Sequence, residues 1–145
     1  MSSVPKSERV TSREEFDALH YRIHDDAVDM INNQFHAKHE IANANQSYIH
    51  SASKMLMSLV WDLVYHIKVA NALFPTTNAE LTERRIEQDK AIGVCFDILT
   101  LYEMAMHKLK VKEDMGVMEI KNIKHQINAI KSWRKSDNKR FKDLK

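Results

Sequence analysis

A stripe of apolar residues in the last third of the chain constrains the fold more than any other feature. Between residues 117 and 130, apolar side chains recur every three or four positions, which is the spacing of one side of an α-helix. Lysines lie between them, off the stripe. Because such a stripe has to be buried against other helices, the sequence predicts a protein built from packed helices. The stripe consists of Val117, Ile120, Ile123, Ile127 and Ile130, and Trp133 extends it.

The scarcity of helix breakers supports the same fold class. The chain has two glycines and two prolines in 145 residues, whereas a β-rich protein of this size needs many more turn residues. Three further segments show helical periodicity, from residue 11 to about 32–35, from 48 to 73, and from 77 to 109. We therefore expect an all-α fold, an antiparallel up-down-up-down four-helix bundle over residues 11–136. A flexible arm is expected at residues 1–10 and a basic tail at 137–145.

Local signals indicate where the expected helices begin and end. A hydroxyl residue followed three positions later by glutamate forms a capping box, and this pattern starts at Thr11, Ser12 and Thr77. Pro75 ends the second helix, because the residue before a proline avoids the helical conformation. Asp114 is expected to cap the fourth helix.

Two residues inside the third helix carry further expectations. Gly93 lowers helix propensity and so predicts a close approach to another helix, while Ile86 is expected to face the core. Residues 36–46 can be read as a linker or as part of a longer first or second helix.

The lone cysteine and the hydropathy pattern bear on the compartment. Cys95 has no partner for an intrachain disulfide, and its apolar helical setting predicts a buried structural thiol. The most apolar segment, residues 55–73, contains Asp62, His66 and Lys68, which predicts a buried helix rather than a membrane span. With a polar start unlike a signal peptide, the sequence predicts a cytoplasmic protein without a membrane role.

No catalytic signature is recognisable, so we expect a non-enzyme without catalytic residues, cofactor or metal. The sequence has no nucleophile elbow, phosphate-binding loop or catalytic dyad, and Glu103 and Glu119 lack the histidine three positions later that di-iron bundles require. His20 and His24 share one helix face and could hold a metal if a second helix added ligands, but surface histidines are the preferred interpretation. A di-metal enzyme is a distant third hypothesis.

Positive charge is concentrated at one end of the chain. Residues 131–145 contain seven Lys and Arg against two Asp, a net charge of +5, so the first 130 residues carry −3 of the overall +2. A basic end predicts a polyanion or an acidic protein surface as partner. Trp133 and Phe141 could stack on unpaired bases, although the apolar stripe places Trp133 in the core and leaves Phe141 freer.

The charged segment 83–90 admits two interpretations. Glu83 with Glu87, and Arg85 with Asp89, lie four residues apart, as on a solvated and internally paired helix face. Alternatively, its arginines and Lys90 contact phosphates or a neighbouring subunit.

Residues 83–93, after a helix closing in Phe74-Pro75, and residues 130–139 together resemble a family of bacterial and phage four-helix-bundle proteins. This family includes the accessory variability determinant (Avd) of diversity-generating retroelements and is akin to proteins encoded in ribosomal-RNA intervening sequences. The likeness covers about residues 12–140. It implies a homopentameric ring with a basic surface, which binds the reverse transcriptase and its template RNA or cDNA as a non-catalytic partner during mutagenic retrohoming. This chain departs from the strongly basic character of the family, since its charge outside the tail is −3.

The resemblance and the basic tail together give a set of candidate contacts to nucleic acid or to a protein partner. The alternative hypothesis is a protein-interaction module of the same family that has no nucleic-acid role. The candidate residues are Arg84, Arg85, Lys90, Arg134, Lys135, Lys139 and Arg140.

Overall fold

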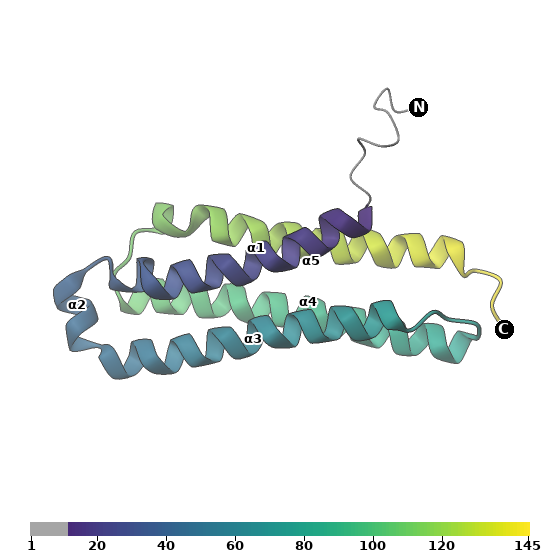
Figure 1. Ribbon diagram of the computed structural model, residues 1–145, viewed down its shortest axis with the longest axis horizontal. Coiled ribbons are helices and arrows are strands. Elements are labelled where there is room, and N and C mark those ends of the chain that lie inside the picture. The colour runs from purple at the N-terminus through teal and green to yellow at the C-terminus, as the bar shows by residue number, and fades with distance from the viewer. Residues whose placement is uncertain (1–11) are drawn as a thin grey trace, which may run out of the picture.

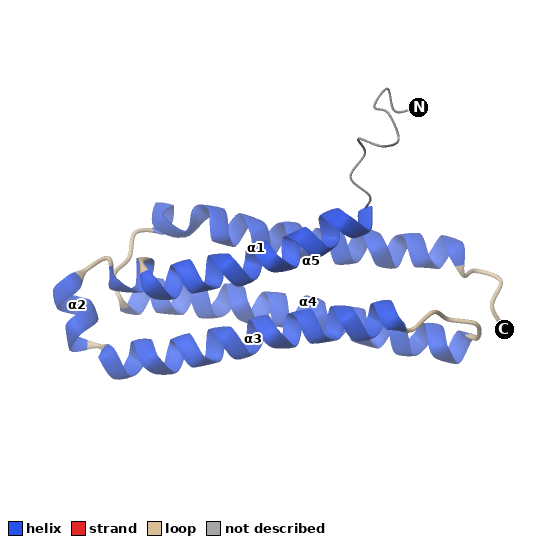
Figure 2. Cartoon of the chain, viewed as in Figure 1, coloured by secondary structure: helices blue, strands red, loops and turns tan. Residues whose placement is uncertain are grey.

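The computed structural model describes the backbone of residues 12–145, with side chains from residue 18 onward, and over this part of the chain it is all-helical. The expected arm at residues 1–10 and the side chains of the two capping boxes at Thr11 and Ser12 lie outside the described residues. Five α-helices and two short 3-10 helices are joined by short loops (Figure 2). They are α1 (Ser12–Asn32), η2 (Gln34–His36), α2 (His39–Ala44), α3 (Gln46–Ala72), α4 (Asn78–Lys108), η3 (Glu113–Gly116) and α5 (Val117–Arg140).

Four long helices lie side by side, and the short α2 joins α1 to α3 at one end (Figure 1). α3 packs on α4, α4 on α5, α5 on α1, and α1 on α3, so that the helices surround one common core. The predicted all-α class is confirmed, and residues 36–46, which the sequence leaves open, contribute α2 and the end of η2. Among the described helices, none combines the length and the apolarity that a bilayer crossing requires.

Most buried residues of α3 and α4 recur at intervals of three and four, the spacing that keeps one side of a helix against its neighbours. In α3 this gives a wholly apolar set, whereas the set in α4 includes Arg84 and Gln88. The α3 set is Ile49, Leu56, Val60, Leu63, Ile67 and Ala70, and the α4 set is Leu81, Arg84, Gln88, Ala91, Cys95, Ile98, Tyr102, Ala105 and Met106.

Two predictions about α4 are wrong, and the positions of its buried residues explain both errors. Ile86 is 47% exposed, because Arg84 and Gln88 occupy the inward positions of that turn. Gly93 is exposed as well, and a Cβ added to it would meet nothing within 4 Å. No close approach to another helix of this chain occurs there.

The predicted capping box at Thr77 is confirmed. The Thr77 hydroxyl accepts a hydrogen bond from the amide of Glu80 at 3.2 Å, and the Glu80 carboxylate accepts from Thr76. These hydrogen bonds, chiefly those from Thr76, hold the pKa of Glu80 below its ordinary value. By contrast, Asp114 lies in η3, and the residue before α5 is Gly116, which has no side chain to serve as a cap.

The predicted boundary between bundle and tail falls inside α5. The helix continues to Arg140, Asp137 is 2% exposed, and Phe141 just beyond the helix is 7% exposed. The amide of Asn78 also donates to the carbonyl of Lys145 at 3.1 Å. The prediction that Phe141 is freer than Trp133 is therefore wrong, since the Phe141 ring is buried beside Arg84 whereas Trp133 is only partly buried.

The buried thiol predicted at Cys95 is confirmed. Its side chain is fully buried, and desolvation raises the pKa of the thiol to about 12. A thiol of this kind is inert at neutral pH.

Candidate nucleic-acid interface

The two sides of α5 differ sharply in charge. α5 has only two carboxylates, and neither lies on its outer side: Asp137 is buried and Glu119 is half-buried. Five exposed lysines fall within about 80° of helical arc at roughly 100° per residue. We call this the lysine face: Lys121, Lys124, Lys131, Lys135 and Lys139.

The lysine face is long and unfavourable for the isolated helix. At about 1.5 Å per residue it extends for roughly 27 Å along α5. Lys131, Lys135 and Lys139 are four residues apart, and like charges at this spacing destabilise a helix by about 0.2–0.5 kcal/mol per pair. Among the described residues none of these five lysines forms an ion pair, so their charge does not stabilise the fold through contacts in this part of the chain.

Two contacts to α4 form one border of this face. The Arg134 guanidinium pairs with the Asp89 carboxylate, and Arg85 donates to the side-chain oxygen of Asn138. Asp89 thus pairs with a residue of α5. The pair between Arg85 and Asp89 that the spacing of four had predicted is replaced by this contact. Both arginines lie at the edge of the lysine face with part of their hydrogen-bonding capacity already used.

The same two contacts fix the register of α4 on α5, since residue numbers rise along one helix as they fall along the other. Continued along the pair, this register places Phe96 opposite Ile127, within about a turn of Lys124 and Lys131. Phe96 is 51% exposed. An exposed aromatic ring next to lysines is the combination found on single-strand binding surfaces, where rings stack on bases.

Arg84, predicted as a surface contact, lies inside the protein and is 5% exposed. Its Nε and Nη2 donate to the two oxygens of Asp137 at 2.8 and 2.9 Å, and its Nη1 donates to the carbonyl of Leu73 at 3.0 Å. Gln88 donates to the same carboxylate at 2.9 Å. Arg84 therefore connects the end of α3, α4 and α5, and it is not available to a partner.

Aromatic rings enclose this buried ion pair. The Arg84 guanidinium lies 4.9 Å from the centroid of Trp133 and 5.7 Å from that of Phe141. Phe74 packs edge-on against Phe141 at 5.6 Å, and Arg140 covers both rings at 5.1 Å. Because these rings serve the interior, Trp133 and Phe141 do not form the stacking surface that the sequence had suggested.

The remaining predicted contacts separate into two groups. Lys135 and Lys139 belong to the lysine face, whereas Lys90 lies on the outward side of α4, away from α5, where it donates to Glu87 at 3.4 Å. Sequence reasoning missed Lys121, Lys124, Lys131 and Phe96. The spacing of the lysines could have identified three of them, but Phe96 required the α4–α5 register.

The histidines of α1 do not behave as a pair. His20, expected at the surface, is 3% exposed, whereas the His24 ring lies near Asp25 and 6.0 Å from the Trp61 ring. Within the described part of the chain, no group of three or more His, Cys, Asp or Glu side chains is arranged to hold a metal ion.

Comparison of the chain with family models, with curated proteins and with solved structures finds no match. The functional conclusion therefore depends on the lysine face and on the resemblance described above.

Proposed function

We propose that this protein is a non-catalytic accessory protein that binds RNA or cDNA along the lysine face of α5, as a partner of the reverse transcriptase of a diversity-generating retroelement in the cytoplasm. The observation that carries the proposal is a roughly 27 Å row of exposed lysines without a carboxylate among them. The underlying architecture would be an antiparallel up-down-up-down four-helix bundle. Such a scaffold holds the row straight.

Binding would be directed at the phosphate backbone. Lysine ammonium groups act as point charges and do not read bases, and a row of this length corresponds to about eight base-pair rises of 3.4 Å. Phe96 would add stacking on an unpaired base, which is tolerant of sequence. This division of roles suits a protein that handles a template without selecting its sequence.

The test compares two triple variants of equal charge change. Lys131, Lys135 and Lys139 are changed to Gln in one protein, and the exposed Lys38, Lys54 and Lys112 are changed to Gln in the control. Affinity for a single-stranded RNA of about 20 nucleotides is measured by fluorescence anisotropy over a salt series. Each lost phosphate contact should reduce the slope of log K against log salt by about 0.7.

We expect the first variant to lose about two units of slope and the control to keep the wild-type slope. Phe96→Ala should weaken binding by about tenfold without changing the slope, because stacking releases no counterions. No binding by the wild type at low salt, or equal losses in the two triple variants, would overturn the proposal.

The partner and the assembly form a second part of the proposal, supported by the resemblance. Five subunits of 16.9 kDa in a ring would have a mass of about 84.5 kDa by light scattering. Co-expression with a reverse transcriptase encoded beside the gene of this protein should give a protein complex that survives nuclease treatment. If the mass is that of a monomer and the polymerase does not co-purify, the alternative of a protein-interaction module without a nucleic-acid role becomes the better account.

A further inference from the structure

The outward side of α4, away from α5, carries a second ordered pattern that the proposed function does not use. Between residues 83 and 108, seven exposed residues lie within about 80° of helical arc, at intervals of three, four or seven positions. We call them the outer stripe: Glu83, Ile86, Lys90, Gly93, Asp97, Met104 and Lys108. In order they read acid, apolar, base, glycine, acid, apolar, base.

This order is complementary to its own reverse. Two copies of the stripe laid antiparallel about Gly93 bring Lys90 of one copy within one residue of the point opposite the partner's Asp97. Ile86 lies four residues, about 6 Å, from the point opposite the partner's Met104. Glu83 is offset from the partner's Lys108 by five residues, about 7.5 Å along the axis. A parallel alignment would instead place like charges against each other, which disfavours it.

The apolar residues and the glycine fit the same arrangement. Ile86 is 47% exposed and Met104 is 63% exposed, and Met55 of α3 adds a further exposed side chain on this side. Gly93, at the centre, has open space in front of its Cα. Glycine inside a helix costs about 1 kcal/mol relative to alanine. Because it has no side chain, the backbone of a second helix can approach closely at this position.

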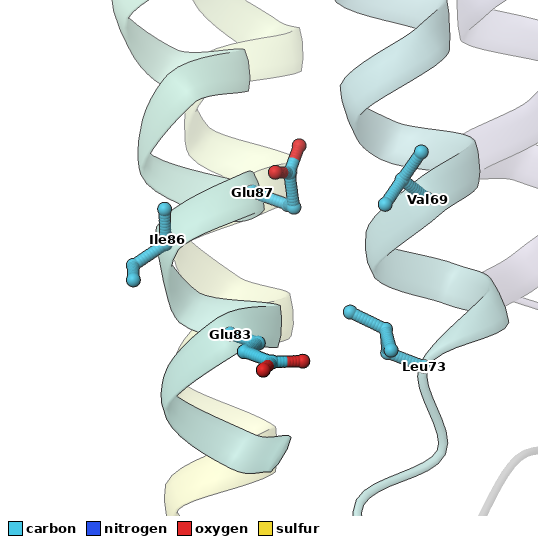
Figure 3. A pocket seen from close by; sticks show the side chains of 5 residues that line it. All are labelled: Val69, Leu73, Glu83, Ile86 and Glu87. Carbon is cyan, nitrogen blue, oxygen red and sulfur yellow. The ribbon is translucent and has the colours of Figure 1, made fainter. Parts of the chain in front are cut away.

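A notch beside Ile86 provides room for a side chain of the second copy. Val69 and Leu73 of α3, with Glu83, Ile86 and Glu87 of α4, line a shallow hollow of about 320 Å³ (Figure 3). In Figure 3 the glutamates point toward α3 while Ile86 points away from it. The antiparallel alignment brings the partner's Met104 within a turn of this notch, and a flexible thioether side chain adapts to such irregular hollows.

From this self-complementary order we propose that two copies of this chain dock through the outer stripe of α4 as a two-fold dimer centred on Gly93. Charge also argues against the other occupants. A nucleic acid would meet Glu83 and Asp97, and the lysine face of another copy would meet Lys90 and Lys108. The contact leaves α5 exposed, so it is independent of the proposed nucleic-acid binding.

Cysteine cross-linking tests the symmetry directly. Only in a two-fold contact does a residue near the axis meet its own counterpart, so Gly93→Cys should form an intermolecular disulfide under mild oxidation. The matched control is Glu103→Cys, exposed on the side of α4 that faces α5. Cys95 should give little background because it is fully buried. Equal cross-linking of the two variants would overturn the proposal.

A charge swap tests the pairing. Asp97→Lys and Lys90→Asp should each weaken dimerisation by about tenfold in sedimentation experiments, because each places like charges opposite on both sides of the axis. The double variant K90D/D97K should recover the wild-type dimer. A double variant no better than either single variant would contradict the two-fold model.

Native mass and RNA binding separate this proposal from the previous one. The two-fold contact alone gives about 34 kDa from two chains of 16.9 kDa, and it doubles any ring formed through other faces. K90D/D97K keeps the net charge, so its RNA affinity should equal that of the wild type. If the wild-type protein binds RNA but shows no two-fold contact, only the dimer is refuted. If it forms the two-fold contact but does not bind RNA, only the nucleic-acid role is refuted.

Discussion

The two ends of the helical bundle are closed by different chemistry. At one end, which we call the ion-pair end, Arg84, Gln88 and Asp137 form a buried polar network under the rings of Trp133 and Phe141. At the opposite end, the methionine end, Met30, Phe35, Met106 and Leu109 fill the core, each 5% exposed or less. There Gly116 leaves room for the methionines, since an added Cβ would lie 3.0 Å from the Met106 sulfur.

The difference shows what each kind of closure depends on. Apolar packing depends on volume and tolerates other side chains of similar size, particularly where flexible methionines can move. A buried ion pair depends on both partners, because removing one leaves a desolvated charge. The ion-pair end should therefore specify how α3, α4 and α5 align, whereas the methionine end should supply stability without fixing the alignment.

The largest effect is expected at the ion-pair end. Asp137→Ala leaves the Arg84 guanidinium buried without a counter-charge and should reduce the free energy of unfolding by about 3–5 kcal/mol in urea denaturation. The double variant R84M/D137L should recover most of this loss, because it removes both charges and keeps similar volume. As a control, the exposed Asp143→Ala should change stability by less than about 0.5 kcal/mol.

At the methionine end, the size of the side chain should matter more than its identity. Met106→Ala creates a cavity and should cost about 2–5 kcal/mol, whereas Met106→Leu should cost less than about 1.5 kcal/mol. Urea denaturation of both proteins gives the comparison. If Met106→Leu were as damaging as Met106→Ala, this end would depend on specific geometry and the contrast with the ion-pair end would disappear.

The smallest effect concerns the charge of Glu119 near the methionine end. Burial, with further contributions from Asp26 and Asp29, raises the pKa of this carboxyl above its ordinary value of 4.5. The folded state thus binds the proton more tightly than the unfolded chain, so stability falls as pH rises from 4.5 through the raised pKa.

Glu119→Gln removes that ionisation but keeps an oxygen to accept the hydrogen bond from Gln34. We expect a rise in Tm of about 1–2 °C at pH 7 and no rise below pH 4, measured by circular dichroism. A lower Tm at pH 7 would show that the charged carboxylate stabilises this end.

The contrast between the ends also explains which features the sequence could predict. Apolar periodicity and the Thr77 capping box are local signals, and the helices they predict are present. Arg84 and Ile86 were assigned to the wrong sides of α4 because hydrophobicity ranks isoleucine as the buried residue. Only the presence of Asp137, 53 residues further along the chain, reverses that order.

The candidate interface shows the same limit. Lys135 and Lys139 could be found from composition, and the other lysines of α5 from their spacing. Phe96 could not, because its position beside the lysines depends on how α4 aligns with α5, which two side-chain contacts determine.

The separation of Arg84 from Asp137 also has a consequence for how the protein is made. On a ribosome that adds about 5–20 residues per second, Arg84 is synthesised roughly 3–10 s before its counter-ion. During this interval α3 and α4 can already pack through their apolar residues, but the Arg84 guanidinium must remain hydrated. The ion-pair end therefore stays open on the nascent chain until residue 137 has left the exit tunnel, and chaperones have that interval in which to bind it.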